Sequence, residues 1–173
     1  MRIILARHGE TDYNKNKKVQ GHSDIPLNEE GIRQGKEAGK KLEGHEIDVA
    51  YSSTLERAFD TARYMLDNSN SENNKNLSVI KDKRLIEKSY GGYEGVSFAE
   101  YGAGLKAGET RGMELDTEAA DRVEEFFKEK YNEHPDKTIL AVCHGGLIRS
   151  FVTQKGIKEV SRGVIINTSV SVL

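Results

Sequence analysis

Two short apolar segments of this chain end in the same pair of residues, a histidine followed by a glycine. Residues 2–6 lead into His8, and residues 138–143 lead into His144. Apolar runs of this length are typical of strands buried in a sheet. One histidine at a strand end is more often a surface residue, and coincidence remains the competing interpretation, but two such endings, the first preceded by Arg7, favour a functional site. Ligands bind beyond the carboxyl ends of the strands in open α/β sheets, so both histidines are expected to face one crevice.

Strand and helix patterns alternate along the chain. This alternation predicts an α/β fold, a three-layer sandwich with a mostly parallel central sheet flanked by helices. Asn28 is the expected N-cap of the first helix, and the hydroxyl groups of residues 52–54 are expected to cap the second. Predicted strands cover residues 2–6, 48–51, 78–80, 138–143, 163–166 and 170–173, and predicted helices cover residues 29–42, 57–65, 117–131 and 147–154.

Two segments are expected to lie outside the core. Residues 67–76 are almost entirely polar and of low complexity, a composition that is expected to bury nothing and predicts a surface loop. Residues 96–116 carry four glycines and little periodicity, which predicts a short insertion or lid. The length of the chain, residues 1–173, corresponds to a single domain.

The overall charge excludes some classes of partner. A net charge of −2 and a pI near 6.2 imply neither nucleic acid nor an anionic membrane, so any anion site must be a local basic cluster. The apolar run before Arg7 is shorter than the roughly 7–15 residues of a signal peptide core. No segment approaches the roughly 20 apolar residues of a membrane span, and cytoplasmic residence is therefore expected. The single cysteine, Cys143, cannot form an intramolecular disulfide, and strand alternation predicts that it points into the core, away from His144.

The order of motifs resembles the signature of the histidine phosphatase superfamily, which has the phosphoglycerate mutase-like fold. The likeness begins at residues 5–11 (LARHGET) and ends at residues 167–169 (NTS), so it spans nearly the whole chain and is very specific. The matching residues between these ends are Asn14, Gln20, Gly21, Asp24, Pro26, Leu27, Gly31, residues 52–55, Arg57, Ala58, Thr61, Ala62, residues 85–87, Gly91, residues 93–95, residues 108–110, Arg122, Val123 and residues 144–146.

The resemblance implies a role for each site residue. His8 matches the nucleophile that becomes phosphorylated, and Glu87 matches the proton donor to the leaving group. Arg7, Arg57 and His144 match the phosphate pocket. Arginine forks suit phosphate oxygens and keep their charge, so two of them could offset most of the roughly −1.5 to −2 charge of a phosphate monoester. Further phosphate or substrate contacts are expected from Asn14, Gln20, Gly21, Tyr90 and Gly145.

This chemistry needs neither a metal nor another cofactor. No close group of histidine, cysteine and acidic residues has the spacing of metal ligands. Of the remaining histidines, His22 is expected either near the pocket mouth or at the surface, His45 at the surface, and His134 in a structural turn. His8 must attack as a neutral imidazole, which nearby guanidinium charge favours.

Hydrolysis is the expected reaction, with a small phosphate ester as substrate. Cofactor-dependent phosphoglycerate mutases carry a longer insertion with paired arginines, whereas residues 96–116 offer only Lys106 and Arg111. A 2,3-bisphosphoglycerate-dependent mutase stays an alternative, because residues 87–91 look like the mutase version of that segment. A non-catalytic phosphate-binding relative is a weaker alternative, since all five pocket positions are intact. Sugar phosphates, phosphoglycerate and a nucleotide-like monophosphate all remain open as substrates. The oligomeric state is also open. Family members often run further, so the chain is expected to stop within its last strand, at Leu173.

Overall fold

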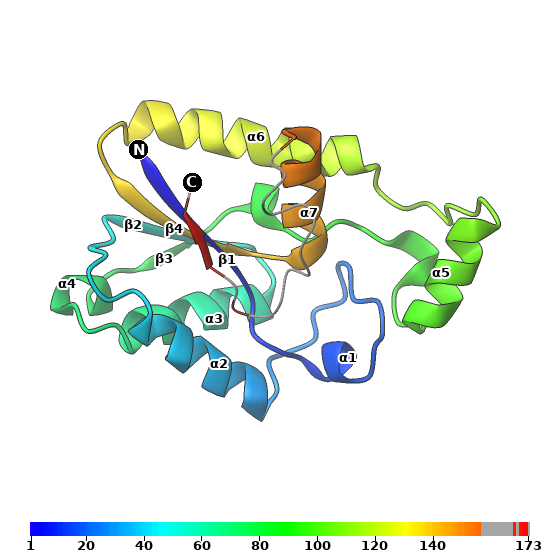
Figure 1. Ribbon diagram of the computed structural model, residues 1–173, viewed down its shortest axis with the longest axis horizontal. Helices are drawn as coiled ribbons and strands as arrows, with labels where there is room; N and C mark the ends of the chain where they lie inside the picture. The colour runs from blue at the N-terminus through cyan, green and yellow to red at the C-terminus, as the bar shows by residue number, and fades with distance from the viewer. Residues whose placement is uncertain (157–167, 169, 173) are drawn as a thin grey trace.

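The structure is a computed structural model that describes residues 1–156, 168 and 170–172. Within these residues a sheet of five strands has the order β3–β2–β4–β1–β5. The first four strands run parallel, and β5 pairs antiparallel with β1 (Figure 1). The predicted α/β fold with a mostly parallel sheet is therefore confirmed. The strands are β1 (Arg2–Arg7), β2 (Val49–Ser52), β3 (Val79–Lys81), β4 (Thr138–Cys143) and β5 (Val170–Val172).

The pairing of the two central strands brings the two histidine motifs together. Arg7 at the end of β1 lies opposite Cys143 at the end of β4, and the next amide, that of His8, donates to the Cys143 carbonyl over 3.0 Å. His144 follows Cys143 directly, so both histidines leave the sheet at its carboxyl edge. Parallel pairing in this register is what turns two distant sequence motifs into one site.

Alternate residues of β1 pack on opposite faces of the sheet, because side chains alternate along a strand. Ile3 and Leu5 belong to the cluster with α6 and α7, whereas Ile4 and Ala6 belong to the cluster with α2 and α3. Figure 1 shows these helix pairs on the two sides of the sheet, which completes the three layers. The four flanking helices are α2 (Glu29–Lys40), α3 (Glu56–Asp67), α6 (Asp116–Glu133) and α7 (Gly145–Gln154).

The two predicted helix caps have different outcomes. Asn28 caps α2 as predicted, since its side chain accepts from the Gly31 amide over 2.9 Å. The prediction for α3 was wrong, because that helix begins after Leu55 and no side chain at its N-cap position accepts a hydrogen bond. The amide of Glu56 instead donates to the carboxylate of Asp24 over 2.9 Å. A residue from a distant loop thus replaces the local hydroxyl cap.

The expectation that residues 67–76 bury nothing was also wrong. The segment contains a short helix, α4 (Glu72–Lys75), capped by the hydroxyl of Ser71. Asn74 is fully buried, accepts from the Ile47 amide over 2.8 Å and donates to the His45 carbonyl over 3.0 Å. The polar composition therefore reflects a buried side-chain amide that forms hydrogen bonds with the backbone of the turn before β2, as well as solvent exposure.

The segment 96–116 contains a helix, α5 (Phe98–Lys106), which its weak periodicity did not predict. In Figure 1 this helix lies apart from the three layers, at the end of the molecule where the sheet ends in the histidine motifs. Its Tyr101 packs edge-on against Tyr90 and Tyr93. The other short helices described are α1 (Asp12–Lys15), η1 (Lys83–Leu85) and η2 (Gly91–Tyr93). The strand predicted for residues 163–166 lies outside the described residues.

Candidate active site

A pocket of about 830 Å³ opens beside the two histidine motifs. Arg7 and His8 come from the end of β1, Glu87 from the loop after η1, and Gly145 and Gly146 from the start of α7. The complete lining is Arg7, His8, Asn14, Lys18, Val19, Gln20, Gly21, Glu87, Lys88, Tyr90, Phe98, Tyr101, Asp116, Thr117, Gly145, Gly146, Arg149, Ser150, Thr153 and Gln154.

The ring of His8 is oriented by a short hydrogen bond. Its Nδ1 lies 2.6 Å from the carbonyl oxygen of Gly9. Because a carbonyl only accepts, Nδ1 carries the proton and the lone pair of the neutral ring lies on Nε2. Burial, followed by the charges of Arg57 and Arg7, lowers the pKa of His8 well below 6.5. The imidazole is therefore neutral near neutral pH, as a nucleophile must be.

His144 lies beside His8 and is fully buried. The two ring centroids are 5.0 Å apart with the planes tilted by 58°. Among the described residues, neither ring nitrogen of His144 has a hydrogen-bond partner. Burial and the charge of Arg57 lower its pKa well below 6.5, so the ring is neutral and offers one N–H donor. A buried polar group without a protein partner is what a ligand would satisfy.

The two predicted phosphate-binding arginines differ in their surroundings. Arg7 lines the pocket, and burial lowers its pKa while Glu87 opposes that shift. A Cβ atom on Gly145 would lie 3.1 Å from Arg7 Nε, so the glycine allows the helix to start against the guanidinium. Arg57 is fully buried behind the lining and donates to the carbonyls of Gly21 and Ser23, each over 2.8 Å. Both guanidinium groups thus place positive charge around His8.

Helix α1 and the loop after it supply three more of the predicted contacts. Asn14, Gln20 and Gly21 all line the pocket. Gln20 accepts from the hydroxyl of Thr11 over 2.8 Å, which fixes its amide. Gly21 has a φ of +57° and packs against Glu94, a combination that any side chain would strain.

Glu87 is held at its carboxylate by the N-terminus of α7. Its carboxylate oxygens accept from the amides of Lys88 and Leu147 over 2.8 Å each, and from Gly146 over 3.2 Å. A Cβ atom on Gly146 would lie 2.8 Å from Glu87 Oε1 and would overlap the hydroxyl of Tyr90. Tyr90 therefore lies beside Glu87 in the pocket, as its predicted substrate contact requires.

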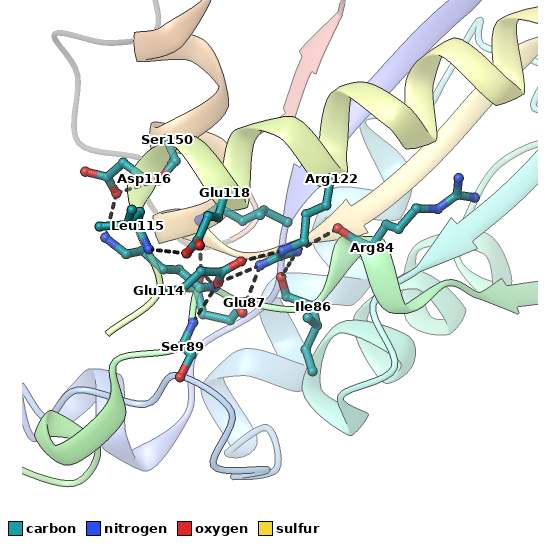
Figure 2. Close-up of polar contacts among 12 residues, drawn as sticks. Arg84, Ile86, Glu87, Ser89, Glu114, Leu115, Asp116, Glu118, Arg122 and Ser150 are labelled. Atoms are coloured by element: carbon teal, nitrogen blue, oxygen red, sulfur yellow. Dashed lines mark hydrogen bonds and ion pairs between the residues drawn. The ribbon is translucent and has the colours of Figure 1, made fainter. Parts of the chain in front are cut away.

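Arg122 and its partner Glu114 hold the backbone of Glu87, a role that the sequence did not predict. Figure 2 shows Arg122 reaching from α6 to the carbonyl oxygens of Arg84, Ile86 and Glu87. Arg122 also forms an ion pair with Glu114. Arg122 belonged to the matching motif, but nothing in its local sequence indicated which backbone groups it would contact.

The far half of the pocket combines aromatic rings with mixed charge. Lys88 forms a 2.6 Å ion pair with Asp116, whose Oδ1 also accepts from Ser150 over 2.8 Å. Arg149 extends from the same face of α7 as Gly145, and no carboxylate in the described part of the chain lies within ion-pair distance of it. This half can therefore receive the non-reacting part of a substrate, including a negatively charged group.

The remaining histidines and the cysteine lie outside the pocket lining. His22 contacts the site from behind, with Nε2 2.8 Å from the Glu87 carbonyl oxygen. His134 lies 3.1 Å from the Tyr51 hydroxyl at the end of α6, and His45 is half-buried rather than fully solvated. Cys143 points into the core as predicted, where burial raises the pKa of its thiol to about 12.

Across residues 1–156, 168 and 170–172, no three histidine, cysteine or acidic side chains come together in a group that could hold a metal ion. Over the same residues, no helix has both the length and the apolar character needed to cross a bilayer.

Residues 3–173 match the family model of the histidine phosphatase superfamily (branch 1). The uncharacterized phosphatase PhoE of Bacillus subtilis is 32% identical over 152 residues, 88% of this chain and 76% of that protein. A 2,3-bisphosphoglycerate-dependent phosphoglycerate mutase of Treponema denticola is 41% identical over 102 residues, 58% of this chain. That match spans only 40% of the mutase.

Solved structures agree with the sequence comparisons. A mycobacterial glucosyl-3-phosphoglycerate phosphatase, solved in complex with VO3, superimposes with a TM-score of 0.81. The match has 27% sequence identity and covers 99% of this chain and 92% of that one.

Proposed function

The chain belongs to the histidine phosphatase superfamily, and from that premise we propose that it hydrolyses a small phosphorylated metabolite through a phosphohistidine at His8. The observation that carries the proposal is the 2.6 Å contact from His8 Nδ1 to the Gly9 carbonyl. This contact leaves the lone pair of a neutral ring on Nε2, the atom that would attack phosphorus.

Attack requires that the charge of the phosphoryl group be offset. Arg7 and Arg57 surround His8 with positive charge, as their lowering of its pKa indicates. His144 would donate its N–H to a phosphoryl oxygen and so satisfy a ring that has no partner among the described residues. Preorganised donors of this kind stabilise the transition state without reorganisation.

Glu87 would then serve both half-reactions. In the first, His8 Nε2 forms a bond to phosphorus, the bond to the ester oxygen breaks, and Glu87 gives its proton to that oxygen. In the second, Glu87 takes a proton from water, whose oxygen bonds to phosphorus as the phosphorus–nitrogen bond breaks. Acid–base assistance of this kind is typically worth about 10²–10⁴-fold.

The far half of the pocket favours a substrate with a second anionic group. Arg149 lies one helical turn from Gly145, so their Cα atoms are about 6 Å apart along α7. Arg149 is close enough to contribute to the lowered pKa of Arg7. In a substrate whose carboxylate lies two or three bonds from the ester oxygen, the carboxylate would therefore reach Arg149 while the phosphate contacts Arg7.

Hydrolysis is preferred to the mutase reaction because the two basic residues of the lid segment, 96–116, do not line the pocket. Arg111 forms ion pairs with Glu100 and Glu109 and stacks on Tyr93, and Lys106 ends α5. A mutase would need basic groups there to hold a second phosphate. The mutase alternative stays open because residues 87–91 resemble the mutase segment and because mutases are among the relatives, including the Treponema protein, whose match covers 58% of this chain.

The decisive experiment measures phosphate release from a panel of phosphomonoesters in EDTA. The panel includes 3-phosphoglycerate with and without 2,3-bisphosphoglycerate, and glycerol 3-phosphate. Release from one or more esters supports the phosphatase. Conversion of 3-phosphoglycerate to its 2-isomer only with the bisphosphate would establish the mutase, and phosphate binding with neither reaction would indicate a non-catalytic relative. A requirement for added metal would count against the mechanism.

A further inference from the structure

Every N–H group of the Arg122 guanidinium already has an acceptor within the protein. Nη1 donates to the carbonyls of Arg84 and Ile86, both over 2.7 Å. Nη2 donates to the Glu87 carbonyl over 3.2 Å and to Glu114 over 3.1 Å, and Nε donates to Glu114 over 2.8 Å. A guanidinium has five N–H donors, so none remains for a substrate. Arg122 is also absent from the pocket lining, and it can act on the chemistry only through the backbone that it holds.

Glu114 keeps that guanidinium in a single orientation. Both of its carboxylate oxygens face Arg122, and its Oε2 also accepts from the Ser89 amide over 2.9 Å. Burial would raise the pKa of Glu114, but the hydrogen bonds from Arg122 and Ser89 lower it overall. The ion pair is only 18% and 17% exposed, so solvent competes little with it. Together the pair binds the chain on both sides of Glu87, from Arg84 to Ser89 (Figure 2).

The carbonyl oxygen of Glu87 is contacted by side chains from two separate elements. His22, from the loop that carries Gln20 and Gly21, places Nε2 2.8 Å from this oxygen, and Arg122 approaches it from α6. The carboxylate end of the same residue is held by the first amides of α7. Glu87 is therefore restrained at its backbone as well as at its side chain.

We propose that Arg122, oriented by Glu114, is a positioning residue that sets the location of the Glu87 carboxyl group for proton transfer to the leaving group. The inference rests on the proposed function, because it concerns the proton donor of that reaction. A proton donor must lie within hydrogen-bond reach of the leaving oxygen, and a displacement of about 1 Å can cost about a hundredfold in rate. Lysine cannot replace the arginine, since an ammonium is a point donor that cannot span three carbonyls and a carboxylate.

The test compares Arg122→Lys, Glu87→Gln and the double variant on two esters. p-Nitrophenyl phosphate has a good leaving group that needs little proton donation, whereas glycerol 3-phosphate has an alkoxide leaving group that depends on it. Arg122→Lys is expected to lower kcat for the alkyl ester by about tenfold or more while the aryl ester loses less than about threefold. The double variant should be no slower than Glu87→Gln alone on the alkyl ester, because both changes remove one function.

Arg84→Lys is the matched control. Its side chain pairs with Asp82 of the same segment and with Glu129 of α6, and its carbonyl, which Arg122 holds, is untouched by the substitution. Both esters should retain the wild-type ratio in this variant. Glu114→Gln provides a second route if Arg122→Lys fails to fold, with the same selective loss expected.

Equal losses on both esters, or additive losses in the double variant, would show that Arg122 supports the fold without positioning the acid. Either result would overturn the inference and leave the phosphatase intact. Hydrolysis of no ester of the phosphomonoester panel by the wild-type protein would overturn the proposed function, and the inference with it.

Discussion

The imidazole rings of His8 and His144 lie with centroids 5.0 Å apart, and burial, followed by the charges of Arg57 and Arg7, lowers the pKa of both and keeps both neutral. Two neutral rings side by side can divide the work of phosphoryl transfer. His8 presents a lone pair on Nε2, and His144 retains an N–H that can donate to a phosphoryl oxygen. Protonation of either ring would remove one of these functions or add charge beside Arg7 and Arg57.

The acid limb of kcat/KM is expected to lie below pH 6.5. Burial and the arginine charges lower the pKa of His8, so its neutral form persists below the ordinary histidine value of 6.5. A pH profile with p-nitrophenyl phosphate measures the limb, because Glu87 contributes least with that ester. An acid limb at or above pH 6.5 would contradict a neutral His8 nucleophile.

Stability is expected to fall as the pH drops below about 6.5. The pKa values of His8 and His144 are lower in the folded protein, so the unfolded chain binds more protons there. Stability therefore rises with pH through this window and is lost on acidification. Thermal unfolding from pH 8 to pH 5 measures the slope, and His144→Gln should make it shallower. An unchanged slope in that variant would exclude His144 as a source.

His8→Ala should abolish turnover and leave the chain folded. The substitution removes the atom that would bond to phosphorus, and a loss of at least about a thousandfold is expected for a nucleophile. Phosphate release and circular dichroism measure the two properties, and labelling quenched with alkaline denaturant, in which the phosphorus–nitrogen bond survives, should detect phosphohistidine only in the wild type. His45→Ala, outside the pocket lining, is the control. Wild-type turnover by His8→Ala would rule out the proposed nucleophile.

Arg149→Gln should weaken the preference for esters that carry a carboxylate. The expected readout is the ratio of kcat/KM for 3-phosphoglycerate to that for glycerol 3-phosphate, two esters that differ mainly in this group. A fall in the ratio of about tenfold corresponds to one lost charged hydrogen bond. Arg63→Gln, an exposed arginine of α3, serves as the control. A ratio that stays at the wild-type value would show that Arg149 does not bind the substrate carboxylate.

Gly146→Ala should slow catalysis through steric displacement. The new Cβ would lie 2.8 Å from Glu87 Oε1 and overlap the Tyr90 hydroxyl, so one of the two must move. Removing that hydroxyl with Tyr90→Phe in the same chain should restore part of kcat. Gly102→Ala in α5, where a Cβ meets nothing within 4 Å, should leave activity unchanged. Full activity of Gly146→Ala would mean that the pocket adapts more readily than its packing indicates.

Local patterns predicted the elements that depend on local physics. The apolar runs of β1 and β4 and the Asn28 cap follow from residues within a few positions of each other. Motif order then predicted which residues would gather, and eight of those predicted, among them His8, Glu87 and Gly145, line one pocket. Their catalytic roles stay predictions until the variants are measured.

The failures share a physical cause. The cap of α3 comes from Asp24, and the buried partner of the Ile47 amide is Asn74, an asparagine in a segment of polar composition. In each case a backbone amide donates to a side chain that is distant along the chain, and composition does not encode such partners.

The sequence by itself determined that two strands each end in a histidine followed by a glycine, because strand formation and motif order are properties of short stretches of chain. Only the tertiary structure decided how those histidines are aimed and how Glu87 is held. The parallel register of β1 and β4 places the rings 5.0 Å apart, and Arg122 reaches the carbonyls of Arg84, Ile86 and Glu87 only after α6 packs beside that segment. Hydrogen bonds and burial depend on atoms brought together by packing, so orientation and proton affinity emerge only with the folded layers.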